Sequence, residues 1–250
     1  MSRTVFALML REMATTYGRS PGGYLWAILE PAAALALLSV IFSLAFRSPG
    51  LGVNFPLFFA TGYLPFAMFT GMSNKMASSI KFSRPLLAYP SVTYLDALLA
   101  RFLLVLLTDL TIAYVFFTGI LFVYDTRTIL SVPPVLLGFA MIAVLGAGVG
   151  VLNCYLFMAF PAWERAWHIL TRPLFIISCV LFVFDEMPEI AQDVLWWNPI
   201  IHSIGAVRRG FYATYEAPYV SVPYTFAVGL GILLVGLLLL RRHHRALIND

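Results

Sequence analysis

The chain has 250 residues, of which 61% are hydrophobic and only 11% are charged, and its mean hydropathy is +0.88. A soluble domain of this length needs far more charge to cover its surface, so the composition excludes that class and indicates an integral membrane protein. The net charge of +4 is typical of basic cytoplasmic loops and does not require a nucleic-acid partner. Both cysteines lie in apolar segments and fit core residues rather than a disulfide framework or a metal site.

The first predicted element is an amphipathic helix that precedes any membrane span. In RTVFALMLREMATTY, Val5 and Met9 lie one turn apart on an apolar face that Phe6 and Leu10 join, while Arg3 and Arg11 fall largely on another face. A helix of this kind lies in the membrane interface, either as a simple anchor or as a docking surface for another protein. We expect residues 1–23 to form this element on the cytoplasmic side.

Six apolar runs are candidates for spanning helices, each of which needs roughly 20 residues. They are residues 24–46, 55–73, 95–123, 129–160, 170–184 and 223–240. The fifth run is short, and we expect part of the following segment to complete it. The predicted fold is therefore all-α, a single transmembrane permease domain over residues 1–250 with six spans.

The basic residues orient these spans. Twelve of the sixteen Lys and Arg residues fall in the amino-terminal segment, after span two, between spans four and five, or in the tail. Cytoplasmic loops carry the excess of Lys and Arg, so this set should lie inside. Both termini are then cytoplasmic, and the segment between spans five and six lies on the outer face.

The inner loop, residues 74–94, contains two prolines and several large apolar residues. One interpretation is a re-entry loop whose charges only fix the topology. Its apolar content favours a surface for a partner protein, because Leu86, Leu87 and Tyr89 would otherwise need cover.

Two carboxylates fall within the spans. Asp109 lies inside the third, where a lone charge is costly, so it is a candidate functional residue. The structural alternative is a protonated carboxyl, or one bonded to Thr108 or Thr111. Glu30 lies near the start of the first span, where a helix dipole also favours a carboxylate.

Catalytic and nucleotide-binding motifs are missing from the sequence. The only lysines, Lys75 and Lys81, lie outside a G-x-x-x-x-G-K-[ST] pattern, and neither H-E-x-x-H nor G-x-S-x-G occurs. The sequence therefore predicts a protein without its own nucleotide site. Gly146 and Gly150 form a G-x-x-x-G pair that indicates close helix packing and is weak evidence for a dimer face.

The outer segment, residues 185–221, contains WWNP and then a predicted helix. Asn198 is a good N-cap and Pro199 a good first helical residue. The segment is too polar to span and too apolar to be free in water, so we expect short re-entrant helices in the outer leaflet. Trp196 and Trp197 are expected at the headgroup level as anchors. With Arg208 and Arg209, they suggest a surface near the exit path of an anionic or sugar-rich substrate.

Three motifs resemble those of one transporter family. Residues 20–31, SPGGYLWAILEP, are similar to S-x-L-G-x-L-W-x-x-L-x-P, with Gly22 in place of Leu. Residues 83–101, SRPLLAYPSVTYLDALLAR, resemble the most specific pattern, N-R-x-L-L-x-[FY]-P-x-V-x-x-x-D-x-x-x-x-R, with Ser83 in place of Asn. Residues 198–208, NPIIHSIGAVR, are similar to N-P-I-x-H-x-[IV]-E-x-x-R, with Gly205 in place of Glu. The chain thus resembles the membrane subunit of a type-two ABC exporter, in the branch that exports bacterial capsular polysaccharide.

This resemblance implies a homodimer in the bacterial inner membrane, with two copies of a cytoplasmic ABC ATPase that bind ATP and Mg. It also implies a glycolipid-terminated polysaccharide as substrate and a periplasmic co-polymerase or export protein as a further partner, beside membrane lipids. The chain itself would be a permease subunit without a cofactor. The inner-loop residues that match the motif or lie beside it are candidates for ATPase coupling: Lys81, Arg84, Leu86, Leu87, Tyr89, Asp96 and Arg101. The candidates for the substrate path are Trp196, Trp197, Arg208, Arg209, Asp109 and Glu30.

Two alternatives remain from the sequence. The same architecture could export O-antigen, teichoic acid or a lipid. A different class, an integral-membrane enzyme acting on lipid-linked substrates, would need several polar residues at one membrane depth. Asp109 stands isolated in its span, which counts against such an enzyme.

Overall fold

A computed structural model describes residues 2–17, 23–87 and 92–249, and within these ranges the regular structure is helical with no strand. The elements are α1 (Ser2–Tyr17), α2 (Gly23–Ala45), α3 (Phe55–Ala77), α4 (Ser79–Leu87), α5 (Tyr94–Val123), α6 (Val132–Ala159), α7 (Pro161–Ile177), the 3-10 turn η1 (Phe184–Glu186), α8 (Glu189–Leu195), α9 (Pro199–Phe211) and α10 (Val222–Asn249). The prediction of an all-α fold is confirmed.

Five helices in the described ranges are long and apolar enough to cross a membrane, namely α2, α3, α5, α6 and α10. They cover the first four predicted runs and the last. The fifth run has different bounds, because its helix, α7, begins nine residues earlier, at Pro161, and ends at Ile177. Pro161 sits at the first turn of α7, where its missing N–H costs nothing, and it separates α7 from α6.

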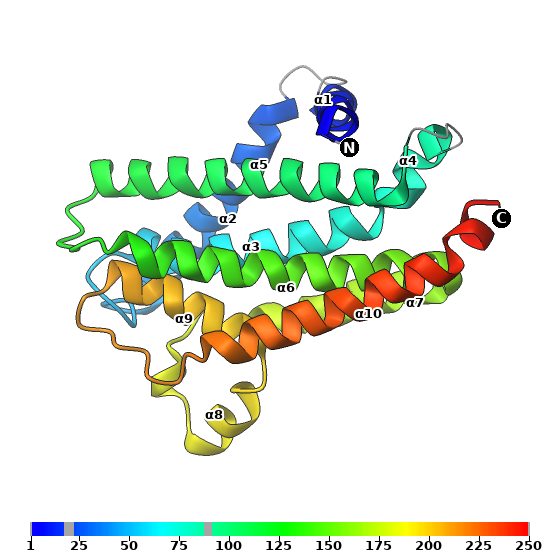
Figure 1. The fold of residues 1–250 in the computed structure, drawn as a ribbon. Coiled ribbons are helices and arrows are strands. Elements are labelled where there is room, and N and C mark those ends of the chain that lie inside the picture. Colours follow the sequence, from blue (N-terminus) through cyan, green and yellow to red (C-terminus); the bar gives the residue numbers. More distant parts are fainter. Residues whose placement is uncertain (1, 18–22, 88–91, 250) are drawn as a thin grey trace.

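Helices α3, α5, α6 and α10 run alongside one another, with α3 and α6 at the centre of the bundle and α2 oblique to them (Figure 1). Figure 1 shows α1, α4 and the carboxy-terminal part of α10 at one end, which we call the inner end. Helices α8 and α9 lie toward the opposite, outer end. Helix α9 packs against α6, α3 and α10, so this short helix belongs to the core rather than to a loose surface loop.

Glycines in α6 allow its neighbours to approach closely. A Cβ on Gly146 or Gly150 would lie 3.0 or 2.7 Å from the Cβ of Met72 or Met76 in α3. A Cβ on Gly148 would lie 2.4 Å from the carbonyl oxygen of Gly229 in α10. The close packing predicted from G-x-x-x-G is therefore present, and these glycines meet helices of the same chain.

Candidate functional site

At the inner end, Arg101 of α5 joins three helices. Its guanidinium forms an ion pair with Glu12 of α1, and both side chains are more than nine-tenths buried. The same guanidinium lies over the ring of Phe82 in α4, 4.6 Å from its centroid. Burial raises the pKa of Glu12, and the positive charge of Arg101 opposes that rise. Arg101 therefore fastens α1 and α4 to the start of α5.

Glu12 was missed by reasoning from the sequence, although a signal was present. Val5, Leu8 and Glu12 follow one another at intervals of three and four residues, and all three are buried. Phe6 and Leu10, expected on the apolar face, are 58% and 49% exposed. The face of α1 that meets α5 is thus rotated from the predicted one and carries a carboxylate.

The proposed coupling loop is largely a helix. Lys81 and Arg84 are exposed on α4, as a docking surface requires. Leu86, which was expected to need cover from a partner, is half-buried and packs against a cluster formed by Val5 and Leu8 of α1 and Ala100 of α5. The chain itself therefore covers part of Leu86, and a role of Leu86 in binding the ATPase stays a prediction.

The remaining residues of the loop motif differ in where the structure places them. Asp96 is buried and completes a capping box: its carboxylate accepts from the N–H and hydroxyl of Thr93, and its own N–H donates to the Thr93 hydroxyl. Asp96 therefore fixes the start of α5. Leu87 ends α4, and Tyr89 lies outside the described residues.

At the outer end, the start of α9 follows the prediction. Asn198 accepts from the backbone N–H of Ile200 and is the N-cap, and Pro199 occupies the first helical position. The Asn198 amide also donates to the Ile177 carbonyl and to the Ser178 hydroxyl. One side chain thus starts α9 and holds the end of α7 beside it.

Arg208 is the deepest charge in the outer segment. It is 0% exposed, and its guanidinium donates to the carbonyls of Phe182, at 2.7 Å, and Val180, at 3.0 Å. The ring of Phe58 lies 4.6 Å from the guanidinium carbon. None of the ion pairs in the described part of the chain involves Arg208, and burial lowers its pKa. The sequence suggested a surface near the exit path that includes Arg208, whereas the structure buries its side chain against residues 180–182.

The remaining outer candidates separate into buried and exposed side chains. Trp196 is half-buried; its indole N–H donates to the Tyr219 carbonyl, and its ring stacks on Tyr224 at 5.1 Å between centroids. Trp197 is 67% exposed, and Arg209 is also exposed. The two tryptophans, treated alike in the sequence, therefore occupy different environments.

Gly205 explains how this helix departs from the related motif. A Cβ on Gly205 would lie 2.5 Å from the Tyr219 hydroxyl oxygen and 2.8 Å from Val220. The Tyr219 hydroxyl in turn shares a hydrogen bond of 3.1 Å with that of Tyr215. Tyr219 thus occupies the space into which a glutamate side chain at position 205 would extend.

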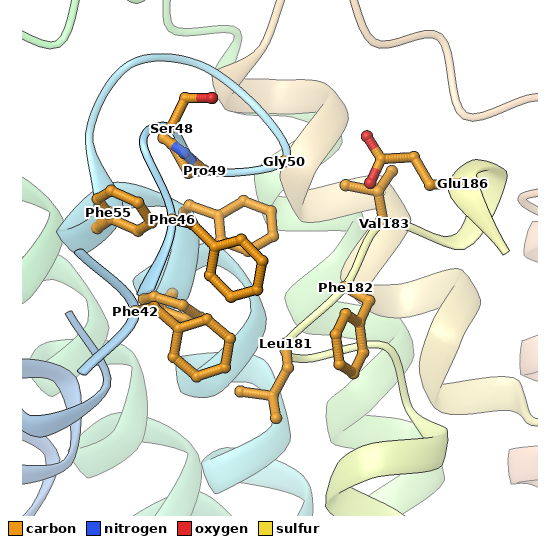
Figure 2. Close-up of a pocket in the computed structure, with 12 residues that line it drawn as sticks. Phe42, Phe46, Ser48, Pro49, Gly50, Phe55, Leu181, Phe182, Val183 and Glu186 are labelled. Atoms are coloured by element: carbon orange, nitrogen blue, oxygen red, sulfur yellow. The ribbon is translucent and has the colours of Figure 1, made fainter. Parts of the chain in front are cut away.

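An aromatic cavity of about 310 Å³ also opens near the outer end (Figure 2). Figure 2 shows Phe42, Phe46 and Phe55 facing Leu181 and Phe182 across it. The polar side chains of the lining are Ser48 and Glu186. The wall formed by residues 181–183 belongs to the segment that Arg208 holds. No signal in the linear sequence joined residues 42–59 to this segment.

The two in-span carboxylates border a second cavity. Glu30 of α2 and Asp109 of α5 both line a space of about 420 Å³ between α2, α3 and α5. The hydroxyls of Thr108 and Thr111 donate to the carbonyls of Leu104 and Leu107 in their own helix. The structural alternative, in which either threonine satisfies Asp109, is therefore not what the structure shows.

Long apolar helices, the contact of α1, α4 and α5 at the inner end, and the buried helix α9 are the features that known proteins can share. A family model described as ABC-2 type transporter matches residues 3–212. The chain belongs to this family. The ABC-2 match runs from α1 to the end of α9, so it includes Glu12 and Arg101 at the inner end and Arg208 at the outer end.

Relatives within the ABC-2 family match nearly the whole chain. Polysialic acid transport protein KpsM of Escherichia coli is 31% identical over 99% of this chain and 96% of its own length. Capsule polysaccharide export inner-membrane protein CtrC of Neisseria meningitidis is 30% identical over 96% of this chain and 91% of its own. The inner-membrane protein BexB of Haemophilus influenzae, named for the same export, is 27% identical over 96% and 90%.

Proposed function

We propose that this chain is the membrane subunit of an ATP-driven ABC transporter that exports capsular polysaccharide across the bacterial inner membrane. The observation that carries this proposal is the match along nearly the full length to relatives named for capsule polysaccharide export at the inner membrane. The chain acts as a permease and has no catalytic residues of its own.

The proposed topology has six crossings. Helix α7 and residues 178–184 make the fifth crossing, and α8 and α9 form a re-entrant element in the outer leaflet. Helix α1 lies in the inner interface, and both termini face the cytoplasm. Two observations support this orientation: most basic residues fall on the predicted inner side, and α1, α4 and the end of α10 share one end of the bundle.

The working assembly is a homodimer with two copies of a separate cytoplasmic ATPase, which bind ATP and Mg. A periplasmic export protein continues the route for a polysaccharide that ends in a glycolipid. The lysines of this chain lie outside any Walker pattern, which supports a separate ATPase.

Coupling to the ATPase runs through α4. Its exposed Lys81 and Arg84 form the docking surface, and Arg101 links α4 to α1 and α5. A push on α4 is therefore delivered to two further helices at once, and the rigid helix α5 carries it toward the outer end.

The function is tested by complementation in a strain from which the related capsule-export gene has been deleted. We expect this chain, expressed with its ATPase, to restore surface polysaccharide and to copurify with that ATPase. Arg84→Glu should reduce copurification and leave membrane insertion intact. Arg127→Glu is the matched control, because its side chain is 79% exposed and lies in the predicted outer loop between α5 and α6. Normal export without any ATPase would contradict the proposal.

The orientation is tested by labelling with an impermeant thiol reagent in cells. Ile190→Cys and Val53→Cys should react from the periplasm and Ser78→Cys should not, and all three native positions are exposed. The natural Cys154 and Cys179 are buried at 0% and 1% exposure, so their background reaction is low. Labelling at position 78 in intact cells would reverse the assigned topology.

A further inference from the structure

The cavity between α2, α3 and α5 differs from its surroundings because polar side chains gather there among otherwise apolar helices. It encloses about 420 Å³, within the range of small-ligand pockets. Its polar lining comes from all three helices: Glu30, Tyr63, Asn74, Lys75 and Asp109.

Asp109 has an oxygen that the protein leaves without a partner. In the described structure, its Oδ2 is buried and has no hydrogen-bond partner. This oxygen lies close to α3, since a Cβ on Gly71 would be 3.6 Å from it, an ordinary contact distance. A buried polar group normally finds a partner, since leaving it unpaired is costly. Because Asp109 also lines the cavity, a ligand bound there is a partner that its carboxylate can reach.

Asn74 and Lys75 supply donors on the facing helix. The indole N–H of Trp167 in α7 donates to Asn74 Oδ1 at 3.1 Å. This bond orients the amide and leaves its NH₂ group to donate to a ligand. Lys75 adds an ammonium to the same wall, so the cavity has acceptors on α2 and α5 and donors on α3.

The charge balance selects the ligand. Two carboxylates and one ammonium line the cavity, so a phosphate or carboxylate entering it meets more negative charge than positive. A sugar hydroxyl suits the mixed wall, because it donates to a carboxylate and also accepts from an amide or ammonium. We propose that this cavity binds an uncharged, hydroxyl-rich sugar unit of the exported chain, with Asp109 accepting from its hydroxyls and Asn74 donating to them. The inference rests on the proposed function and adds to it a selectivity for uncharged units.

The binding test uses protection of an introduced cysteine in the purified complex with the ATPase. Ala67 lines the cavity, so the thiol of Ala67→Cys should react with a maleimide. The two natural cysteines are buried and should add little background reaction. Maltotetraose, an uncharged probe, should slow this reaction several-fold, whereas a tetramer of sialic acid, an anionic probe, should not. Ser48→Cys, at the rim of the aromatic cavity, is the matched control and should be unaffected by either sugar.

Substitutions at Asp109 complete the test. Asp109→Leu should abolish protection by maltotetraose, and Asp109→Asn, which keeps one acceptor, should retain part of it. Both variants are compared only where the ATPase still copurifies, which excludes misfolded protein. Equal or better protection by the sialic acid tetramer, or full protection in Asp109→Leu, overturns the inference.

The two proposals fail in different ways. If the complex restores capsule export but neither sugar protects position 67, the sugar site is wrong and the exporter stands. If maltotetraose protects the cysteine at position 67 but the deletion strain gains no surface polysaccharide, the assigned transport function is wrong and the sugar site stands.

Discussion

The two ends of the bundle each bury an arginine, and they neutralise it in different ways. At the inner end, Arg101 meets the carboxylate of Glu12. At the outer end, Arg208 meets two backbone carbonyls and an aromatic ring, with no ion pair in the described part of the chain. One arginine is balanced by a charge, and the other by dipoles.

The same contrast extends to their neighbours. Side chains at the outer end bond mainly to backbone: Arg208, Asn198, Trp196, His202, Gln192 and Tyr224 all do so. Inner contacts join side chains to each other, as in the bonds from Trp163 to Asn153 and from Trp167 to Asn74. Short helices and turns leave many carbonyls and N–H groups unpaired, whereas long helices satisfy most of their own. The outer segment therefore needs side-chain donors simply to be buried.

The largest effect is expected at Arg208. Arg208→Ala leaves the carbonyls of Val180 and Phe182 unpaired in a buried site and opens a cavity, which should cost about 3 to 5 kcal/mol. Thermal unfolding in detergent measures the loss. Arg208→Met fills the volume without donors, so it should remain nearly as unstable if the hydrogen bonds dominate. Export should fall in step with the amount of folded protein; normal folding with lost export would instead restore a direct substrate role.

A smaller loss is expected at Arg101. Arg101→Ala leaves Glu12 buried without its cation, but Glu12 is able to take up a proton, which limits the cost to about 2 kcal/mol. The double variant Glu12→Leu with Arg101→Leu removes both charges and should recover most of the stability. Thermal unfolding reports stability, and ATPase copurification reports the link between α4 and α5. If the double variant is as unstable as Arg101→Ala, the ion pair is not what holds this cluster.

Gly62 tests how closely the outer arginine is fitted. A Cβ there would lie 2.8 Å from the Val180 carbonyl oxygen and 3.1 Å from Arg208 Nη2. Gly62→Ala should therefore destabilise the protein by about 1 to 2 kcal/mol, through displacement of residues 178–183. Gly119→Ala in α5 is the control, because its Cβ would meet no atom within 4 Å. Equal stability of the two variants would mean that residues 178–183 move to accept the extra methyl group without a measurable loss of free energy of unfolding.

The smallest effect is a pH dependence confined to the outer end. Ser221 N–H donates to His202 Nδ1, so Nε2 carries the proton and donates to the Trp196 carbonyl. Burial lowers the pKa of His202 below the ordinary 6.5. Stability is thus complete above about pH 6.5 and is lost as the pH falls through the folded pKa, since the unfolded chain takes up the proton first.

Hydrogen exchange at the Ser221 amide, measured between pH 7 and 5 and corrected for the intrinsic rate, follows this loss. The Ala97 amide at the inner end, bonded to the Thr93 carbonyl, is the internal control and should show no such change. His202→Gln should remove the pH dependence of protection at Ser221. A pH-independent protection at Ser221 in the native chain would show that protonation leaves this bond intact.

Reasoning from the sequence located the elements better than their surroundings. The N-cap at Asn198 and the helix that follows it were predicted because capping signals are local properties of the sequence. The bounds of α7 were missed, since hydropathy carried the fifth run past Ile177 although the helix ends there. Glu12 escaped notice because its partner Arg101 is far away in the chain.

Composition and pattern by themselves determined that this chain is an all-α membrane protein, where most of its long helices lie, and which family it resembles. Those properties depend on apolar length and on motifs, which are read along the chain. Only the tertiary structure decided that Arg208 faces inward and that Asp109 lies close to Gly71, with its buried Oδ2 lacking a hydrogen-bond partner among the described residues. Burial and pairing depend on which distant segments meet, and an arginine on an amphipathic helix looks the same in sequence whether its partners are water or the carbonyls of a neighbouring turn.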